Sequence, residues 1–247
     1  MPKPYRLIAF DCVNTLYLPD ASRIPVVELD GKQVPTTAGL LHERLAPLLP
    51  DLALHQAHLA LRNAWRWAEA QRGPELLEVP ARRRFRQFFF ELGLREPEER
   101  LLDELLELHM RAVTGSFILP AAHRKVLTRL RRSHRLALFS NFDHAPSMQR
   151  LLRESGISDW FDPLIISDAL GYRKPGRAAF SRAIGLIGEA PQDILFVGDS
   201  LEDDVQGARQ AGIDVAWINA KGLPAPENFP PTYELRELPA LIDLLAE

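Results

Sequence analysis

Three apolar runs in the sequence end in side chains that could carry out chemistry. They are residues 7–10, 136–139 and 194–197, followed by Asp11, by Ser140 and Asn141, and by Asp199. A carboxylate at the end of a buried strand, such as Asp11, can act as a nucleophile, as a metal ligand or as both. The simplest structural alternative is that Asp11 only caps the turn after its strand. The other polar segments decide between these interpretations.

A carboxylate pair, a hydroxyl group and a lysine would together form a site for phosphate chemistry. Asp11 and Asp199 can bind a hard cation such as Mg²⁺, which prefers carboxylates together with phosphate oxygens of the substrate. Ser140 and neighbouring backbone N–H groups can hold phosphate oxygens at a strand-to-helix turn. Lys174 can neutralise charge on Asp11 and on a phosphoryl group. Such a set suits the transfer of a phosphoryl group to a carboxylate.

A parallel sheet would bring these side chains together. The predicted strands after the first are residues 136–139, 164–166, 194–197 and 215–218, and the predicted helices are 121–132, 145–155, 176–187, 202–211 and 238–246. Strands that alternate with helices form parallel sheets with right-handed crossovers, and their carboxyl ends share one edge. We therefore predict an α/β fold with Asp11, Ser140 and Asp199 at that edge.

Residues 36–115 predict a helical insertion, because apolar residues recur there at helical spacing in four stretches with no strand between them. Before this insertion, residues 17–35 alternate around Asp30 and Gly31, a favourable hairpin turn, and predict a small β-flap close to Asp11. The predicted domains are a core of residues 1–16 and 117–247 and an inserted flap and helical cap of residues 17–116.

The composition excludes several classes of partner. The net charge of −3 gives no basis for a nucleic-acid partner or an anionic membrane surface. No run is long enough to span a bilayer, and the first residues lack the apolar core of a signal peptide. The one cysteine, Cys12, allows no intrachain disulfide and no thiolate metal cluster, and we interpret it as a small buried residue. We expect a cytoplasmic protein that is a monomer or a homodimer.

Four segments of the chain resemble the haloacid dehalogenase (HAD) superfamily of hydrolases. They are FDCVNTL at residues 10–16, SNFD at 140–143, YRKP at 172–175 and VGDSLEDD at 197–204, in the family's order. The helical insertion after the first segment matches the family's type 1 cap. The resemblance implies a Rossmann-like parallel-sheet core with an inserted helical cap domain, and hydrolysis of a small phosphorylated metabolite.

The resemblance also implies catalytic roles for individual residues. Asp11 is then the nucleophile that forms an aspartyl-phosphate. Lys174 orients this nucleophile, and Thr15 supports the loop that carries it. Ser140 and Asn141 bind the phosphate group of the substrate.

By the same resemblance, the implied cofactor is Mg²⁺. Its ligands are the side chains of Asp11 and Asp199 and the backbone carbonyl of Val13. An acidic residue after Asp199 supports the metal from behind its ligands. Asp204 lies at the spacing from Asp199 that is commonest in the family, and Asp203 is the alternative for this role.

Val13 departs from the family's usual pattern. Phosphatases of the family usually carry a second aspartate there, which protonates the leaving alkoxide and then activates water. Valine can do neither, and general acid–base catalysis contributes roughly 10²–10⁴-fold in rate. The sequence therefore predicts a slow phosphatase, a restriction to good leaving groups, or an acid from elsewhere. Asp143 is the candidate for that acid, and the alternative is that it caps the helix expected from Ala145.

Val13 also keeps two other functions open. One is a weakly active or inactive HAD-fold protein with a binding or regulatory role, against which the retained Asp11, Lys174 and Asp199 argue. The other is a metal-free 2-haloacid dehalogenase, which Asp199 disfavours. Within the family, the chain resembles the subgroup of haloacid dehalogenase-like hydrolase domain-containing protein 3. That subgroup also combines a residue other than aspartate at this position with an SNFD segment. This resemblance leaves the reaction open.

Two groups of cap residues could select the substrate. One or two of the four arginines between residues 82 and 86 could face an anionic substrate, or they could belong to the solvated and packed faces of one helix. Trp65 and Trp67 point to different sides of their helix. We expect one of them in the core and the other at the cap–core cleft or in a dimer contact.

Overall fold

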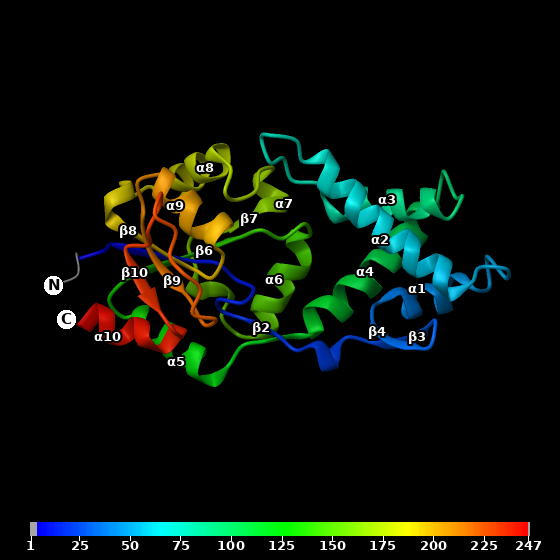
Figure 1. Ribbon diagram of the computed structural model, residues 1–247, viewed down its shortest axis with the longest axis horizontal. Coiled ribbons are helices and arrows are strands. Elements are labelled where there is room, and N and C mark those ends of the chain that lie inside the picture. The colour runs from blue at the N-terminus through cyan, green and yellow to red at the C-terminus, as the bar shows by residue number, and fades with distance from the viewer. Residues whose placement is uncertain (1–3, 247) are drawn as a thin grey trace.

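Six parallel strands form the central sheet, in the order β10-β9-β8-β1-β6-β7. The computed structural model describes residues 4–246 (Figure 1). The strands are β1 (Leu7–Phe10), β6 (Arg135–Ser140), β7 (Leu164–Ile166), β8 (Ile194–Gly198), β9 (Asp214–Ile218) and β10 (Tyr233–Leu235). The predicted α/β fold with a Rossmann-like parallel sheet is confirmed.

Strand β1 lies inside the sheet and is buried on both faces. Ile8 and Phe10 belong to the apolar cluster on one face, and Leu7 and Ala9 belong to the cluster on the other. This two-sided burial explains why the strand is a continuous apolar run instead of an alternating pattern.

Helices cover both faces of the sheet (Figure 1). The first face is covered by α5 (Ala121–Leu130), α6 (Ala145–Glu154) and α10 (Leu241–Ala246). The second is covered by α7 (Ser167–Leu170), α8 (Arg177–Ile187) and α9 (Gly207–Gln210). None of the helices described is both long and apolar enough to cross a bilayer.

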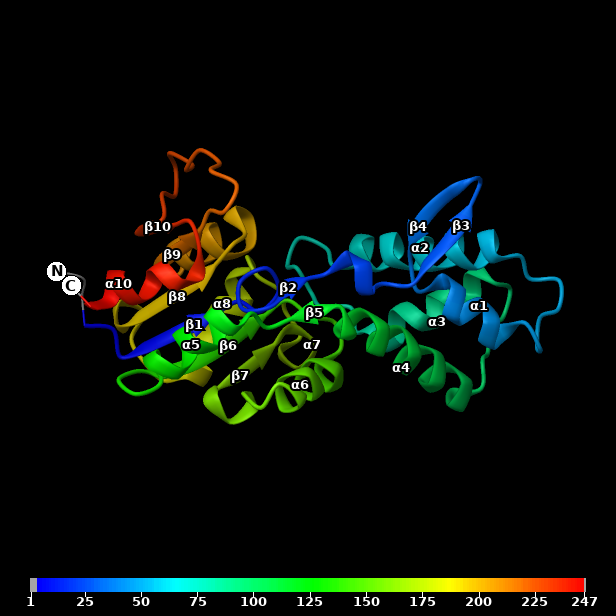
Figure 2. The same ribbon diagram turned by 90° about the horizontal axis from the view of Figure 1, so that it is seen from below.

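Four further helices, which we call the cap helices, form an apolar cluster of their own. They are α1 (Ala38–Leu45), α2 (Leu54–Gln71), α3 (Ala81–Glu91) and α4 (Glu99–Gly115). The buried residues of α2 are small and lie three or four positions apart: Ala57, Ala60, Ala64 and Ala68. Such a stripe lets neighbouring helices approach closely, and buried phenylalanines of α3 fill the space against it. Figures 1 and 2 show these helices beyond the carboxyl edge of the sheet, at the opposite end of an elongated molecule from α10.

The predicted hairpin forms, but it lies far from Asp11. Its strands are β3 (Val26–Leu29) and β4 (Lys32–Pro35), joined by Asp30 and Gly31 at positive φ values of 50° and 73°. It packs on the cap helices, at the end remote from the sheet (Figures 1 and 2). Val27 lies so close to α1 that a Cβ added at Gly39 would come within 2.7 Å of it. The prediction of a flap at Asp11 is therefore wrong, because the apolar side of the hairpin is covered by the cap.

A different strand pair joins the sheet to the helical part. Strand β2 (Leu18–Pro19) pairs in antiparallel fashion with β5 (Phe117–Ile118), where the chain leaves the core and returns to it. These crossings lie beside the boundaries predicted at residues 16 and 117, and the division into domains stays a prediction. Residues 1–3 and 247 of the predicted core lie outside the described residues.

The remaining differences concern short elements. The sequence pattern did not predict β10, which follows a proline-rich stretch, or the single turn of α7. The predicted helix at residues 202–211 begins as a π-helical turn, Leu201–Gln206, before α9. Short 3₁₀ helices span Ala21–Arg23, Ser158–Trp160, Pro191–Asp193 and Leu238–Ala240. None of these differences changes the order of the long strands and helices.

Candidate active site

The three strand ends predicted to carry chemistry meet at the carboxyl edge of the sheet. Phe10 pairs in register with Leu138 of β6 and with Val197 of β8. Asp11 therefore leaves the sheet between Ser140 and Asp199. Asp11 and Ser140 are buried and Asp199 is half-buried. The sheet register thus brings Asp11 together with residues that lie more than a hundred positions further along the chain.

Lys174 is the centre of a buried charge network. Its Nζ donates hydrogen bonds to Asp11 Oδ1 at 2.7 Å and to Asp204 Oδ1 at 2.6 Å. Asp204 Oδ2 accepts a hydrogen bond from the N–H of Ser200 at 3.0 Å. A Cβ at Gly198 would collide with the Asp204 carboxylate, so glycine is needed for this close approach. Lys174 therefore holds the Asp11 carboxylate by a direct hydrogen bond, and its role in orienting a nucleophile stays a prediction.

The electrostatics of the cluster favour an added cation. Burial raises the pKa of Asp11 to about 7 although Lys174 opposes the shift, and burial raises the pKa of Asp199 to about 6. Burial by itself would lower the pKa of Lys174, but the charges of Asp11 and Asp204 outweigh this effect and raise it. Lys174 therefore stays protonated while several carboxyl groups compete for its charge. A divalent cation would relieve that excess of negative charge.

The geometry of the carboxylates fits a divalent metal ion. One oxygen each of Asp11, Asp199 and Asp204 lies within 4.8 Å of the others. The carbonyl of Val13 accepts no hydrogen bond from the residues that the structure describes, so it is available as a ligand. Both oxygens of Asp204 already accept hydrogen bonds, from Lys174 and Ser200, which suits a supporting position behind the metal. Oxygen ligands of this kind suit Mg²⁺.

Several hydrogen-bond donors beside Asp11 have no acceptor within residues 4–246. They are the backbone N–H groups of Cys12, Val13 and Asn141. Converging donors of this kind hold phosphate oxygens in proteins. Thr15 Oγ1 donates to Asp199 Oδ1 at 3.3 Å, so Thr15 supports a carboxylate of the candidate metal site. Asn14, between these residues, takes a positive φ of 66°.

The side chain of Asn141 is occupied by the loop that carries Lys174. Its Oδ1 accepts a hydrogen bond from the N–H of Lys174 at 2.9 Å. Its Nδ2 donates to the carbonyl oxygen of Lys174 at 3.0 Å and to Asp203 Oδ2 at 3.2 Å. Only the backbone N–H of Asn141 is left for a phosphate oxygen, and the side chain positions the lysine.

Asp143 contacts helix α3, and its side chain does not bind the N-terminus of helix α6. Its Oδ2 accepts a hydrogen bond from Nε of Arg84 on α3 at 2.9 Å, and Nη2 of the same guanidinium group lies 2.8 Å from this oxygen. The N–H of Ala145, at the start of α6, donates to Asp168 at 2.8 Å. The predicted capping role of Asp143 is therefore wrong, because a buried guanidinium group binds the carboxylate in preference to a backbone N–H. Bound in this way, Asp143 is not free to serve as the general acid.

The other arginines of α3 lie away from the site. Arg82 and Arg86 both pair with Glu99 on the exposed side of the cap. Arg83 stacks over Trp67, with its guanidinium carbon 5.2 Å from the ring centre. Trp67 is therefore half-buried beneath an arginine instead of lying in the core.

A second buried ion cluster was not predicted from the sequence. The carboxylate of Glu78 is 1% exposed, and it accepts hydrogen bonds from Arg173 Nη1 at 2.6 Å and from the hydroxyl of Ser167. Glu78 comes from the segment between α2 and α3, and Arg173 directly precedes the lysine of the site. An acidic residue inside the apolar stretch LLEVP, residues 76–80, was the available signal of a buried carboxylate.

Backbone contacts reinforce this junction between cap and core. The N–H of Glu78 donates to the carbonyl of Gly171 at 3.0 Å, and the N–H of Arg173 donates to the carbonyl of Leu76 at 2.9 Å. A Cβ at Gly176 would lie 2.8 Å from the carbonyl oxygen of Arg173. The loop that carries Lys174 is therefore held by the cap as well as by Asn141.

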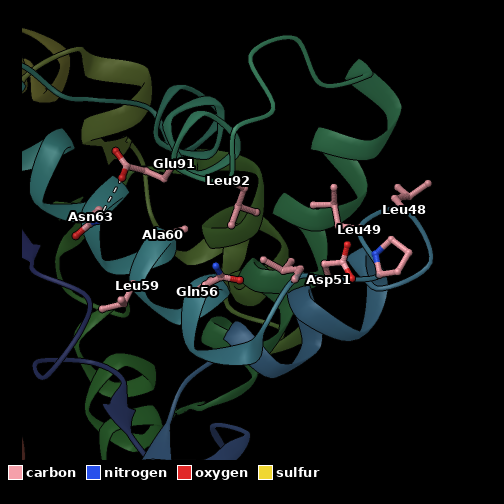
Figure 3. Close-up of a pocket in the computed structure, with 11 residues that line it drawn as sticks. Leu48, Leu49, Asp51, Gln56, Leu59, Ala60, Asn63, Glu91 and Leu92 are labelled. Carbon is pink, nitrogen blue, oxygen red and sulfur yellow. Dashed lines mark hydrogen bonds between the residues drawn. The ribbon is translucent and has the colours of Figure 1, made fainter.

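A cavity of about 440 Å³ lies between cap and core beside the strand ends. Val13 and Asn141 line it from the core, and Trp65 and Arg84 line it from the cap. Another hollow, of about 460 Å³, lies between residues 48–52, helix α2 and the end of α3, and it contains none of the predicted site residues (Figure 3). The site therefore opens into the first cavity, and Trp65 lies at the cleft where the sequence expected one of the tryptophans.

The comparison with protein families agrees with this arrangement. Residues 5–212 match the model of the haloacid dehalogenase-like hydrolases. The chain belongs to this family. It is therefore a HAD hydrolase, and its strand-end aspartates and central lysine occupy the segments through which it resembles the family.

Relatives and solved structures of the HAD hydrolase cover almost the whole chain. It is 32% identical over 229 residues to the phosphoserine phosphatase of Thermus thermophilus, which covers 91% of this chain and 88% of that protein. The crystal structure of 2-haloacid dehalogenase from Pseudomonas syringae covers 98% of both chains, with a TM-score of 0.74 and 20% identity. The magnesium-bound structure of YfnB from Bacillus subtilis covers 99% of this chain and 100% of that one, with a TM-score of 0.63 and 21% identity. At these identities the two structures share the fold of the chain, and the fold is common to proteins of different activity.

Proposed function

We propose that this HAD hydrolase is a Mg²⁺-dependent phosphatase that acts on a small phosphorylated metabolite through Asp11. The observation that carries the proposal is the buried network in which Lys174 contacts both Asp11 and Asp204. A buried lysine on a strand-end carboxylate suits a nucleophile that must stay oriented while negative charge develops beside it. A protein that only binds a partner has no physical need for such a cluster.

In the proposed reaction, an oxygen of Asp11 attacks the phosphorus atom of the substrate. A bond forms between this oxygen and phosphorus, and the bond between phosphorus and the ester oxygen breaks. The alkoxide leaves with the electron pair and takes a proton from water. Water then attacks the aspartyl-phosphate, which releases inorganic phosphate and restores Asp11. Throughout, Lys174 holds the carboxylate, and the free N–H groups and the Ser140 hydroxyl donate to the phosphoryl oxygens.

A metal ion completes this proposal. Asp11, Asp199 and the carbonyl of Val13 would hold Mg²⁺, with Asp204 behind them. When bound, Mg²⁺ supplies positive charge to the phosphoryl oxygens. The relative from Thermus thermophilus is a phosphatase, and YfnB, which shares the fold, has been crystallised with magnesium. Both facts support the proposal for this chain.

This chain lacks the general acid that usually protonates the leaving group in the family. Val13 cannot donate a proton, and Asp143 is bound to Arg84. The alkoxide must therefore be stable enough to leave without a positioned acid. We infer that turnover is slow for ordinary alkyl phosphates and faster for esters with good leaving groups.

In the same proposal, residues 17–116 act as a type 1 cap over a catalytic core of residues 1–16 and 117–247. The partners are small molecules, with no nucleic acid and no membrane surface, and the place of action is the cytoplasm. The proposal favours a phosphatase over a metal-free 2-haloacid dehalogenase because three carboxylates converge at the site.

Hydrolysis of p-nitrophenyl phosphate, with and without Mg²⁺, tests the proposal in the wild type and in Asp11→Asn and Val13→Asp. We expect Mg²⁺-dependent turnover in the wild type, its loss in Asp11→Asn, and an increase of roughly tenfold or more in Val13→Asp, because this variant restores the acid. If the folded wild type and Val13→Asp are both inactive, the phosphatase proposal fails. Turnover of a 2-haloacid that survives a chelator would favour the dehalogenase, and the absence of both activities would favour a binding role.

A further inference from the structure

The cavity between cap and core has mostly apolar walls. Its floor contains Val13 and Asn141, which neighbour Asp11 and Ser140 in the sequence. A phosphate ester bound at Asp11 would therefore extend its alcohol part into this space. The apolar residues around it include Leu61 and Trp65 of α2, Met110 and Val113 of α4, and Phe117 and Phe142 beside the core. At about 440 Å³, the cavity has the size of sites that bind small ring compounds.

The ring of His109 is a neutral polar group in the part of the cavity wall formed by α2, α3 and α4, where Arg62 and Arg84 are the charged groups. His109 is only 9% exposed, and its Nδ1 lies 2.7 Å from Thr37 Oγ1. The Thr37 hydroxyl has no other hydrogen-bond partner among the residues described, so it can give its proton to Nδ1. The other nitrogen, Nε2, then carries hydrogen and has no acceptor within residues 4–246. Burial, helped by the charge of Arg84, lowers the pKa of His109 well below its ordinary value, so the ring is neutral.

The charges around the cavity favour a substrate without a positive group. Arg84 and Arg173 line the cavity, and each is neutralised by a carboxylate, Asp143 and Glu78 respectively. Arg62 also lines it, and it has no ion-pair partner in the described part of the chain. An ammonium group on a substrate would therefore meet the positive charge of Arg62 in the cavity and would find no unpaired carboxylate there. A substrate such as an amino-acid phosphate would leave its ammonium group without a partner there.

We propose that the cavity binds the alcohol part of the substrate, and that this part is a flat, largely apolar ring with one hydrogen-bond acceptor. His109 Nε2–H donates to that acceptor, and the leucine, methionine and aromatic side chains of the cavity enclose the ring. This proposal rests on the proposed phosphatase function and names its substrate class. It also agrees with the missing acid at Val13 when the ester oxygen is attached directly to the ring, because the phenoxide of such a substrate is a good leaving group. His109 is in this view a specificity residue, and Asp11 and Lys174 remain responsible for the reaction.

Substrate comparison with the Mg²⁺-loaded wild type tests the apolar cavity. We expect kcat/KM to be at least about tenfold higher for 1-naphthyl phosphate than for glycerol 1-phosphate or O-phosphoserine, because apolar contacts in a pocket discriminate by this order. Val113→Asn should reduce this preference, and Arg82→Ala, on the outside of the cap, should keep it. Equal rates for the three substrates would overturn the proposal while leaving the phosphatase function intact. No hydrolysis of any phosphate ester would overturn both.

A second comparison tests His109 separately from folding. The substrates are phenyl phosphate and the three pyridyl phosphates, whose ring nitrogen is an acceptor. In His109→Phe, kcat/KM should fall by roughly tenfold for at least one pyridyl phosphate and stay within about twofold for phenyl phosphate, since only the former loses a hydrogen bond. An equal loss for all four substrates would show that His109 has only a structural role. If His109→Phe does not fold, His109→Gln serves instead, because it keeps a hydrogen-bond donor. If the folded wild type shows no preference for any pyridyl phosphate over phenyl phosphate, the assignment of His109 is overturned.

Discussion

Two adjacent residues, Arg173 and Lys174, belong to two buried ion clusters of different character. Lys174 faces the strand ends, where Asp11 and Asp204 accept its hydrogen bonds and Asp199 lies nearby. Arg173 points to the cap, where it pairs with Glu78. The first cluster joins residues of the core alone, and the second joins the core to the inserted helical segment.

The difference lies in the balance of charge. Around Lys174, three carboxyl groups meet one cation, and burial raises the pKa values of Asp11 and Asp199. Arg173 pairs with the single carboxylate of Glu78, with the Ser167 hydroxyl as an added donor. An unbalanced cluster attracts a metal ion or a substrate group, and a balanced one holds segments together. The excess of buried carboxylates over buried cations, and not burial alone, therefore distinguishes a candidate binding site from a structural ion pair.

The largest effect that separates the clusters is expected from Lys174→Met. The variant keeps the length of the side chain but leaves Asp11 and Asp204 without their cation, so the nucleophile is neither oriented nor kept ionised. We expect kcat to fall by roughly a thousandfold or more, as for other residues that act as one catalytic unit. The exposed Lys125→Met on α5 is the control and should retain wild-type turnover. Retention of activity in the Lys174 variant would show that the cluster is not catalytic.

Glu78→Gln tests the cluster on the cap side. Removing one partner of a buried pair leaves the Arg173 charge uncompensated, and we expect a loss of about 3 kcal/mol in the free energy of unfolding. Because Glu78 has no hydrogen bond or ion pair with Asp11, Lys174 or Asp199, kcat should change by less than about tenfold. Urea unfolding and turnover are measured together, with the exposed Glu75→Gln from the same segment as control. A variant with unchanged stability and lost turnover would contradict the structural role of this cluster.

Mg²⁺ binding should depend on pH because the unbalanced cluster also binds protons. The pKa values of about 7 for Asp11 and about 6 for Asp199 lie above the ordinary carboxyl range, so both groups are largely protonated below pH 6 and ionised near pH 8. Protons compete with the metal for these oxygens, so affinity rises with pH. Titration calorimetry should give a Kd roughly tenfold lower at pH 8 than at pH 6. Equal Kd values at the two pH values would show that these carboxylates do not hold the metal.

The smallest effect is expected from the exposed ion pairs of the cap. Arg82→Ala removes contacts to Glu99 and Asp103 at the surface, where solvent screens charge. Turnover and melting temperature should stay close to those of the wild type. A large rise in KM would instead indicate that Arg82 contacts the substrate, and it would support the interpretation that these arginines select an anionic substrate.

The sequence predicted the parts of the fold that follow from local pattern. The strand at residues 7–10 follows from a continuous apolar run, the helices between residues 36 and 115 follow from apolar residues at helical spacing, and the hairpin follows from Asp30-Gly31. The place of that hairpin did not follow, because an apolar hairpin face can pack on any apolar surface. The capping prediction for Asp143 failed for a related reason, since Arg84 lies 59 residues away and sequence spacing does not report such a contact.

By itself, the sequence predicted which polar residues lie together at the carboxyl edge of the sheet. Asp11, Lys174 and Asp199 follow strand ends or lie in the motif between them, and a parallel sheet can only bring such ends to one edge. Only the tertiary structure decided which partner each buried charge takes. Adjacent side chains such as Arg173 and Lys174 point in different directions, and their partners come from distant segments. Pairing of buried charge depends on three-dimensional proximity and desolvation, neither of which is encoded in the spacing of residues along the chain.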